Sequence, residues 1–218
     1  MKICYIISVM CMKIKVFRNI DDIYYNVDNF PSSNKILLIT GLSGSGKSHL
    51  SKEIAKEYNA IHFQVEWLIH KSHVSDECKY ILDSFLDKYP SIVPLVDSKW
   101  DNVKVEDNNK LLKHYMNLFF KHFLEVKDPN KAYIVEGLQL FTLIDYDLIK
   151  DYPIIIKGTS SINSLKRRLR RDYKKRKNQK LNVRVKFLFR VLKQSRLYQF
   201  KHRKKLNLFI EKRSCNGK

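Results

Sequence analysis

The stretch KILLITGLSGSGKS, residues 35–48, carries most of the information about the fold of this 218-residue chain. Apolar and β-branched residues at 36–40 run into a turn that holds Gly41, Gly44 and Gly46, and a lysine and a serine follow. The whole chain has only 6 glycines, so half of them fall within this one turn. A backbone that needs so much conformational freedom at one point must bend sharply or approach a ligand closely.

Residues 41–48 match the pattern G-x-x-x-x-G-K-[ST], and chemistry explains each residue type. Backbone N–H groups that converge on a phosphate chain bind it well, and glycines let the main chain wrap closely. A helix that begins near Lys47 directs its free N–H groups and the positive end of its dipole at the same anion. Lys47 is expected to act on the β- and γ-phosphates and Ser48 to bind Mg²⁺. The predicted nucleotide-contacting residues are Gly41, Leu42, Ser43, Gly44, Ser45, Gly46, Lys47, Ser48 and His49.

This pattern has meaning only between a strand and a helix. Residues 35–40, KILLIT, predict a short strand that is buried on both faces. Residues 48–60 place Leu50, Ile54 and Tyr58 on one face of a helix. The alternative is a glycine–serine linker that matches by chance, but it does not explain why strand, lysine and helix follow in register. The sequence therefore predicts a nucleotide-phosphate site.

Strand-like and helix-like segments alternate along the rest of the chain. Further strands are predicted at 60–67, 131–137, 152–159 and 206–211, and the segment 67–126 is largely helical. Such alternation predicts an α/β fold with a parallel sheet and helices on both faces. No internal repeat is visible, and no linker divides the chain into two domains.

The net charge of +20 is distributed very unevenly. Of 42 lysines and arginines, 23 lie in residues 157–218, which hold only 2 of the 22 aspartates and glutamates. The first 156 residues are nearly neutral. A segment this basic attracts polyanions such as nucleotide phosphates, nucleic acid or an anionic membrane surface. Within it, residues 181–205 predict an amphipathic helix whose interleaved aromatic residues either bind single-stranded nucleic acid or belong to the core.

The remaining chemistry-bearing residues give weaker signals. The four cysteines lie far apart, without the spacing of a zinc site or a disulfide framework, so a cytoplasmic location is expected. The histidines, including His62, show no ligand spacing and are interpreted as structural or exposed. An apolar run near the N-terminus is too short to span a bilayer, and no transmembrane segment is expected. That run is explained by an edge strand, a signal peptide or an over-extended start with Met12 as the initiator.

Three short motifs, taken in order, point to one family. Residues 39–48 read ITGLSGSGKS, residues 133–137 read YIVEG, and residues 164–176 read SLKRRLRRDYKKR. These motifs resemble those of P-loop kinases that act on nucleosides and nucleotide monophosphates, most nearly the uridine-kinase-like branch. In that order, they resemble the phosphate loop (Walker A motif), a strand ending in EG, and the lid pattern R-L-x-R-R-x-x-R-D. The matching lid positions are Arg167, Arg168, Arg171 and Asp172. Ser164 stands where the pattern has its first arginine, and only the phosphate loop is highly specific.

The resemblance implies a P-loop NTPase three-layer sandwich with a five-stranded parallel sheet in the order 2-3-1-4-5, helices on both faces and a helical lid. It also implies ATP and Mg²⁺ as cofactors, and transfer of the γ-phosphoryl group to a small acceptor. Two departures limit it. The strand after the first helix ends in FQVEW, residues 63–67, instead of an aspartate-containing stretch. The adenine-contacting loop would have to be residues 212–218 or lie elsewhere.

Phosphoryl transfer mainly requires positioning and positive charge, which suggests roles for four further residues. Arg168 and Arg171 lie three apart on a predicted helix and could clamp phosphates together, although charge runs are usually solvated faces. Glu66 and Glu136 end apolar strands, whose carboxyl ends line the ligand crevice of an open α/β sheet. Glu66 is predicted as the general base and Glu136 as part of the Mg²⁺ shell with Ser48. Alternatively, either glutamate caps a helix or pairs with a lysine.

The domain organisation that follows has one main unit. Residues 1–34 form an N-terminal extension with a predicted edge strand, residues 35–211 form the kinase-like domain, and residues 212–218 form a tail. Within the domain, the segment 67–126 is the expected acceptor-binding insert and the segment 160–180 the basic lid region.

Three functions agree with these features of the sequence. The first is an ATP-dependent kinase with a nucleoside or nucleotide as acceptor. The second is a kinase that acts on polynucleotide ends, with nucleic acid bound by the basic C-terminal region. The third is a regulatory ATPase without an acceptor. Specificity would reside in the segment 67–126, whose sequence does not reveal the acceptor.

Overall fold

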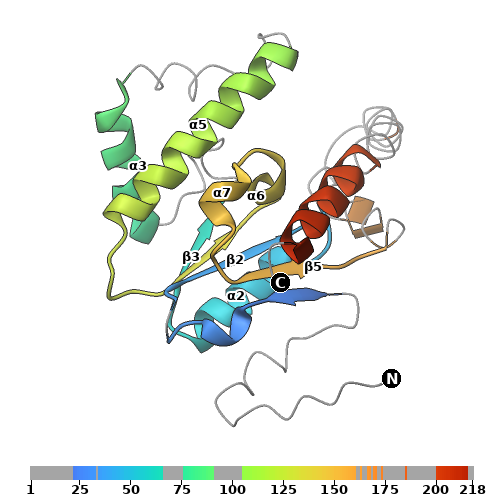
Figure 1. Ribbon diagram of the computed structural model, residues 1–218, viewed down its shortest axis with the longest axis horizontal. Coiled ribbons are helices and arrows are strands. Elements are labelled where there is room, and N and C mark those ends of the chain that lie inside the picture. Colours follow the sequence, from blue (N-terminus) through green and yellow to red (C-terminus); the bar gives the residue numbers. More distant parts are fainter. Residues whose placement is uncertain are drawn as a thin grey trace.

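The computed structural model of the chain describes residues 22–32, 34–65, 76–90, 105–160 and 200–215, with single residues at 163, 166, 167, 169, 170, 173 and 185. For residues 76, 77 and 105–109 it describes the backbone alone. Figure 1 shows a twisted sheet with helices on two sides. A helix over residues 200–215, called the C-terminal helix below, lies against one of those sides.

Five strands form one sheet in the order β1-β5-β2-β4-β3. They are β1 (Ile23–Tyr25), β2 (Ile36–Gly41), β3 (Ile61–Gln64), β4 (Tyr133–Glu136) and β5 (Ile154–Lys157). Strands β2 to β5 are parallel, whereas β1 pairs with β5 in the antiparallel direction. Every residue of β2 is buried, as expected of a central strand covered on both faces. The chain is therefore an α/β protein with a mostly parallel sheet.

The predicted strand order 2-3-1-4-5 is confirmed for its first four strands, which are β3, β4, β2 and β5 in that order across the sheet, and is wrong for the fifth. Residues 206–211, predicted as the last parallel strand, are helical, and the antiparallel β1 takes the edge position beside β5. Leu206, Phe209 and Arg213 are buried at helical spacing, whereas Leu208 is half exposed. An apolar run this short fits a strand and a helix equally well, and packing decides between them.

Helices cover both faces of the sheet and give three layers. One face carries η2 (Val27–Asn29) and α2 (Lys47–Glu57), and the other carries α3 (Asp76–Lys88), α5 (Val105–Val126), α6 (Gln139–Thr142), α7 (Tyr146–Ile149) and the C-terminal helix (Figure 1). The side chains of β2 alternate accordingly. Leu37 and Ile39 belong to the core cluster of α2, and Ile36 and Leu38 belong to the cluster on the opposite face.

An aromatic cluster joins α3 to α5 and both to the sheet. Phe85 of α3 meets Tyr115 and Phe119 of α5 edge-on, with 5.4 and 5.1 Å between ring centroids. Phe63 of β3 stacks on Phe119 at 5.5 Å. These two helices make up most of the described part of the segment 67–126. Although α5 has 22 residues, no helix in the described ranges is long and apolar enough to cross a membrane.

Arg213 attaches the C-terminal helix to the rest of the molecule. Its guanidinium is buried and donates to the carbonyl oxygen of Ile149 at 2.9 Å and to that of Tyr152. It also lies over the ring of Tyr25, 5.4 Å from the centroid, which links the helix to β1. The hydroxyl groups of Tyr25 and Ser214 add a hydrogen bond of 3.1 Å. The position of the C-terminal helix is thus set from both β1 and the segment before β5.

Candidate functional site

Residues 41–46, called the glycine turn below, connect the end of β2 to the start of α2. Gly41, Gly44 and Gly46 have φ angles of 143°, 83° and 95°, which side chains rarely tolerate. A Cβ on Gly41 would also lie 2.6 Å from the carbonyl oxygen of Lys157 on the neighbouring strand. The glycines that open and close the turn are therefore required by the backbone conformation itself.

The N-terminus of α2 opens directly onto the glycine turn. Its N-cap, Gly46, supplies no side-chain hydrogen bond, and the first turn of the helix holds no acidic residue. Because the first N–H groups of a helix have no acceptor within the helix, this end carries partial positive charge. The His49 N–H donates to the Gly46 carbonyl at 3.1 Å, and the exposed His49 ring pairs with Glu53. His49 is one of the predicted nucleotide-contacting residues, and both its N–H and its imidazole already have partners within the helix.

Ser45 lies inside the glycine turn with a buried hydroxyl. Its N–H donates to the carbonyl oxygen of Leu42 at 3.1 Å, which closes the turn. Its Oγ is buried and has no hydrogen-bond partner within the part of the chain that the structure describes. A buried hydroxyl without a partner costs free energy that a ligand can recover. The turn thus combines unhindered backbone, the start of a helix and an unpaired hydroxyl, which together fit an anion with several acceptor oxygens.

Ser48 of α2, Glu136 of β4 and His62 of β3 meet beside the glycine turn. Ser48 Oγ donates to Glu136 Oε1 at 2.6 Å, and His62 Nε2 lies 3.1 Å from Glu136 Oε2. The parallel register explains the meeting, because Glu136 is aligned with Ile39 of β2 and with Gln64 of β3. Glu66, the other carboxylate predicted from the sequence, lies outside the described residues.

Glu136 is held as a carboxylate although it is buried. Burial alone would raise the pKa of its carboxyl group, but hydrogen bonds from His62 and Ser48 and the nearby charge of Lys47 outweigh burial and lower the pKa below its usual value. An ionised carboxylate accepts hydrogen bonds only, so His62 Nε2 is the donor in their contact. The site therefore holds a fixed negative charge directly beside a hydroxyl.

Ser48 Oγ and Glu136 Oε1 together offer two oxygen ligands. Mg²⁺ prefers oxygen ligands and usually keeps several waters, so it needs few protein groups when a phosphate supplies the rest. No group of three or more histidines, cysteines, aspartates or glutamates that could hold a metal ion occurs among the described residues. Two oxygen ligands are too few to hold Mg²⁺ by themselves, so Ser48 and Glu136 would suit a cation that a ligand also coordinates.

Arg167 lies over the glycine turn. Its Nη1 donates to the carbonyl oxygen of Ser45 at 3.0 Å and approaches that of Gly44 at 3.4 Å. This arginine belongs to the basic segment in which the sequence predicts phosphate clamps. The two clamps predicted from helical spacing, Arg168 and Arg171, lie outside the described residues. Arg167 is thus one member of this segment that the structure brings to the turn.

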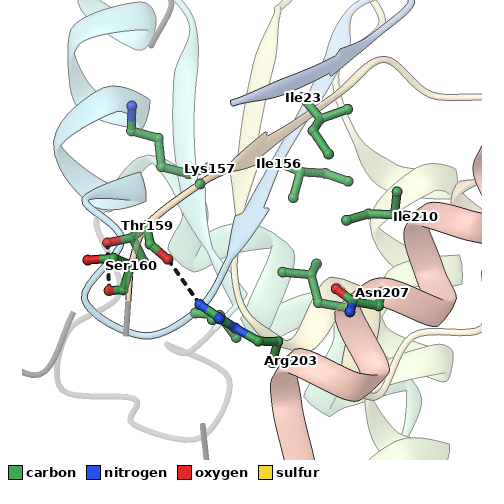
Figure 2. A pocket seen from close by; sticks show the side chains of 11 residues that line it. Ile23, Ile156, Lys157, Thr159, Ser160, Arg203, Asn207 and Ile210 are labelled. Atoms are coloured by element: carbon green, nitrogen blue, oxygen red, sulfur yellow. Dashed lines mark hydrogen bonds between the residues drawn. The ribbon is translucent and has the colours of Figure 1, made fainter. Parts of the chain in front are cut away.

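A cavity of about 450 Å³ lies beside the glycine turn, between the sheet edge and the C-terminal helix. Leu42 of the glycine turn belongs to its lining. Ile23, Ile156 and Ile210 make an apolar part of the wall (Figure 2). The polar part comes mainly from the end of β5, from the residues that follow it and from two side chains of the C-terminal helix. The labelled polar lining residues are Lys157, Thr159, Ser160, Arg203 and Asn207 (Figure 2).

The C-terminal helix contributes its polar side chains from successive turns. Arg203 Nη2 donates to the carbonyl oxygen of Thr159 at 3.3 Å, drawn as a dashed line in Figure 2, and the amide of Asn207 lies one turn further on. The sequence suggested residues 212–218 as a base-contacting loop, but residues 212–215 continue the helix and the cavity lining ends at Ile210.

Sequence reasoning missed His62, Arg203 and Asn207. His62 shows no ligand spacing along the chain, and only the register between β3 and β4 brings it to Glu136. Arg203 lies in a charge run, and Asn207 lies in the segment predicted as a strand. Helical spacing of Arg203, Asn207 and Ile210 was the available signal, because these positions share one face.

No protein-family model matches the chain, and no curated protein matches it either. The class of protein is therefore defined by the fold and the site alone: an α/β protein with a mostly parallel sheet, and with a glycine turn at the carboxyl end of its central strand.

Proposed function

We propose that the protein is an ATP-dependent phosphotransferase that binds ATP and Mg²⁺ at the glycine turn. Its acceptor would be a nucleoside or a nucleotide. The observation that carries the proposal is the 2.6 Å contact between Ser48 Oγ and Glu136 Oε1, directly behind a glycine turn that opens onto a helix N-terminus. A hydroxyl and a carboxylate at this place are the ligands expected for a cation bound together with phosphates.

The donor phosphates would be held by groups that the chain already brings together. Backbone N–H groups of the turn and of the start of α2 would bind the phosphate oxygens, and Ser45 Oγ would gain the partner that it lacks. Lys47 and Arg167 would supply positive charge at the turn. Mg²⁺, when bound, would neutralise charge on the phosphates and orient them. Electrostatic positioning of this kind supplies most of the catalysis in phosphoryl transfer.

The nucleoside part of ATP would lie in the cavity next to the turn. Ligand pockets typically measure roughly 300–1,000 Å³ and combine apolar walls with a few polar groups, and this cavity has both features. Its apolar walls suit a planar ring. The Asn207 amide offers a donor and an acceptor to a base edge, whereas Arg203 offers donors only.

The acceptor side rests on predictions from the sequence. Glu66 as the general base, and Arg168 and Arg171 as phosphate clamps, stay predictions because these residues lie outside the described part of the chain. The aromatic cluster of α3 and α5 packs on β3, at whose end Glu66 follows two residues later. An acceptor bound between this cluster and the turn would therefore lie close to the end of β3.

Transfer of a labelled phosphoryl group tests the proposal. The intact chain is incubated with γ-labelled ATP, Mg²⁺ and a panel of nucleosides and nucleotides, and the labelled products are separated. We expect one class of acceptor to be labelled, with loss of labelling in Lys47→Ala. Lys52→Ala is the matched control, because Lys52 is an exposed lysine of the same helix. Full labelling by Lys47→Ala, or ATP loss that needs no acceptor, would contradict the proposal.

A second candidate is a kinase that acts on polynucleotide ends, and one observation favours it. Lys201, Lys204 and Lys205 are exposed on the C-terminal helix, next to Arg203 in the cavity wall. Phosphates along a strand could follow this basic surface towards the glycine turn. End labelling of a short oligonucleotide, with affinity that falls steeply as salt rises, would identify this function. Labelling of free nucleosides alone would exclude it.

A further inference from the structure

His62 is a partly enclosed histidine to which the proposed function gives no role. Its side chain is 13% exposed, and its Nε2 lies 3.1 Å from Oε2 of Glu136, whose own side chain is 6% exposed. The other oxygen of the same carboxylate, Oε1, accepts the hydrogen bond from Ser48. The two oxygens of Glu136 thus have different partners, one from β3 and one from α2.

The sheet fixes where this histidine lies. In the β3–β4 pairing, His62 is opposite Ile134 and Gln64 is opposite Glu136, so His62 reaches the carboxylate diagonally along the same face of the sheet. A diagonal reach of this kind is within the length of an imidazole. The contact is therefore determined by backbone register and not by a flexible surface side chain.

A carboxylate needs such a contact if one particular oxygen is to face a ligand. The last torsion of a glutamate side chain is broad, so the carboxylate of an otherwise unrestrained glutamate turns easily and exchanges its two oxygens. Partners of metal ligands fix this orientation, and losing one typically lowers metal affinity about 10- to 100-fold.

We propose that His62 is a positioning residue that holds Oε2 of Glu136 and so keeps Oε1 directed at Ser48, where the nucleotide-bound divalent cation would be shared. The inference rests on the proposed function of the glycine turn as a Mg²⁺–nucleotide site. It adds a residue from β3 to a site otherwise built from the glycine turn, α2 and β4. It also explains why a histidine lies in a strand whose neighbours are mainly apolar.

Three substitutions of His62 distinguish a positioning role for its imidazole from a purely structural one. His62→Gln keeps an amide donor at about the place of Nε2, whereas the shorter side chain in His62→Asn places its donor nearer Nδ1 and cannot reach Oε2. His62→Leu removes the donor altogether. His122→Leu is the matched control, because His122 is also enclosed but lies on α5 and bonds to Ser84.

The measurement compares nucleotide binding with and without a divalent cation. Binding of a non-hydrolysable ATP analogue is followed by calorimetry in EDTA and in Mg²⁺, and Mn²⁺ binding in its presence is followed by electron paramagnetic resonance. We expect His62→Leu and His62→Asn to bind the analogue normally in EDTA and to lose about tenfold or more in Mn²⁺ affinity. His62→Gln should restore most of that affinity. In His122→Leu, the divalent cation should increase the nucleotide affinity as much as it does in the wild type.

Each opposing result has a separate meaning. If His62→Leu and His62→Asn lose nucleotide affinity equally with and without the cation, His62 only supports the fold and the inference is overturned. Unchanged Mn²⁺ affinity in both variants would overturn it as well, while leaving the proposed function intact. If the wild-type chain binds no nucleotide under either condition, the proposed function itself is wrong and this inference falls with it.

Discussion

Gly41 ends β2, and two independent constraints act on it. Its φ of 143° lies in a region that side chains rarely adopt, and a Cβ would lie 2.6 Å from the carbonyl oxygen of Lys157. That carbonyl cannot move away freely, because Gly41 and Lys157 are aligned in the pairing of β2 with β5. A side chain here would strain the turn and the sheet at once, so the conformation of the turn depends on this one residue.

Gly41→Ala is therefore expected to lower both the stability and the ligand affinity of the protein. The strained φ alone should cost about 1–3 kcal/mol of the free energy of unfolding, and the contact with the carbonyl adds to it. Urea denaturation of the variant and the wild type measures the loss. Gly158→Ala is a suitable control for the stability measurement, because Gly158 is not among the glycines with positive φ. Equal stability of Gly41→Ala and wild type would contradict the account of the turn.

The residues of the site differ in how well the sequence predicts them. The spacing of Gly41, Gly46, Lys47 and Ser48 identifies the turn. The glycines permit its backbone conformation, and the lysine and serine are the residue types expected beside a phosphate. Glu136 could be singled out because it ends an apolar strand. His62 could not, since its role depends on the register of two strands far apart in the sequence.

At the scale of elements, α3 and α5 enclose His122 between a serine hydroxyl and two charged side chains. His122 Nε2 bonds to Ser84 Oγ at 2.8 Å, and its Nδ1 lies 4.0 Å from Oε2 of Glu125. Glu125 in turn pairs with Lys88 at 2.8 Å. Burial and the nearby Lys88 lower the pKa of His122, while Glu125 acts in the opposite direction. The packing of these two helices thus favours the neutral imidazole.

This environment predicts a loss of stability in mild acid. The unfolded chain takes up a proton on this imidazole near the ordinary histidine pKa of about 6.5, whereas the folded chain resists protonation until the pH is lower. Stability should therefore fall as the pH drops from about 7.5 to about 5.5. Urea denaturation at both pH values should show a smaller fall in His122→Gln. His114→Gln, at an exposed histidine of α5, should behave as wild type. An identical fall in His122→Gln would refute the prediction.

The elements themselves are predictable where burial is continuous. The strands β2, β4 and β5 are runs of buried apolar residues, and the sequence indicates all three. The edge is different, because β1 has only three residues and pairs with a strand more than a hundred residues later. Residues 206–211 have the composition of a strand, but the buried positions follow a helical period. Short segments depend on tertiary packing, which local sequence does not determine.

At the scale of the whole molecule, the C-terminal helix completes the cavity wall. It carries part of the basic charge that is expected to attract polyanions, and it meets the sheet through the buried Arg213. That guanidinium donates to two carbonyl oxygens, of Ile149 and Tyr152, and lies over the ring of Tyr25. One residue thus connects the helix, β1 and the approach to β5.

Arg213→Met is expected to destabilise the fold and to weaken binding in the cavity. One buried and one partly buried carbonyl group would lose a charged donor, at a cost of about 2–4 kcal/mol in the free energy of unfolding. Thermal and urea denaturation measure this loss, and nucleotide affinity should fall because the cavity wall loosens. Lys212→Met, at the exposed neighbouring position, is the control. Wild-type stability of Arg213→Met would show that the helix is held by other contacts.

Binding of ATP in the presence of Mg²⁺, measured by isothermal titration calorimetry on the intact chain, tests the central claim most directly. We predict saturable binding at one site by the wild-type chain. Lys47→Ala should weaken it by about tenfold or more, because a charge-assisted contact with the phosphates is lost. The exposed control, Lys52→Ala, should bind as wild type does. Absence of binding by the wild-type chain, or equal affinity in Lys47→Ala, would contradict the assignment of the glycine turn as a nucleotide site.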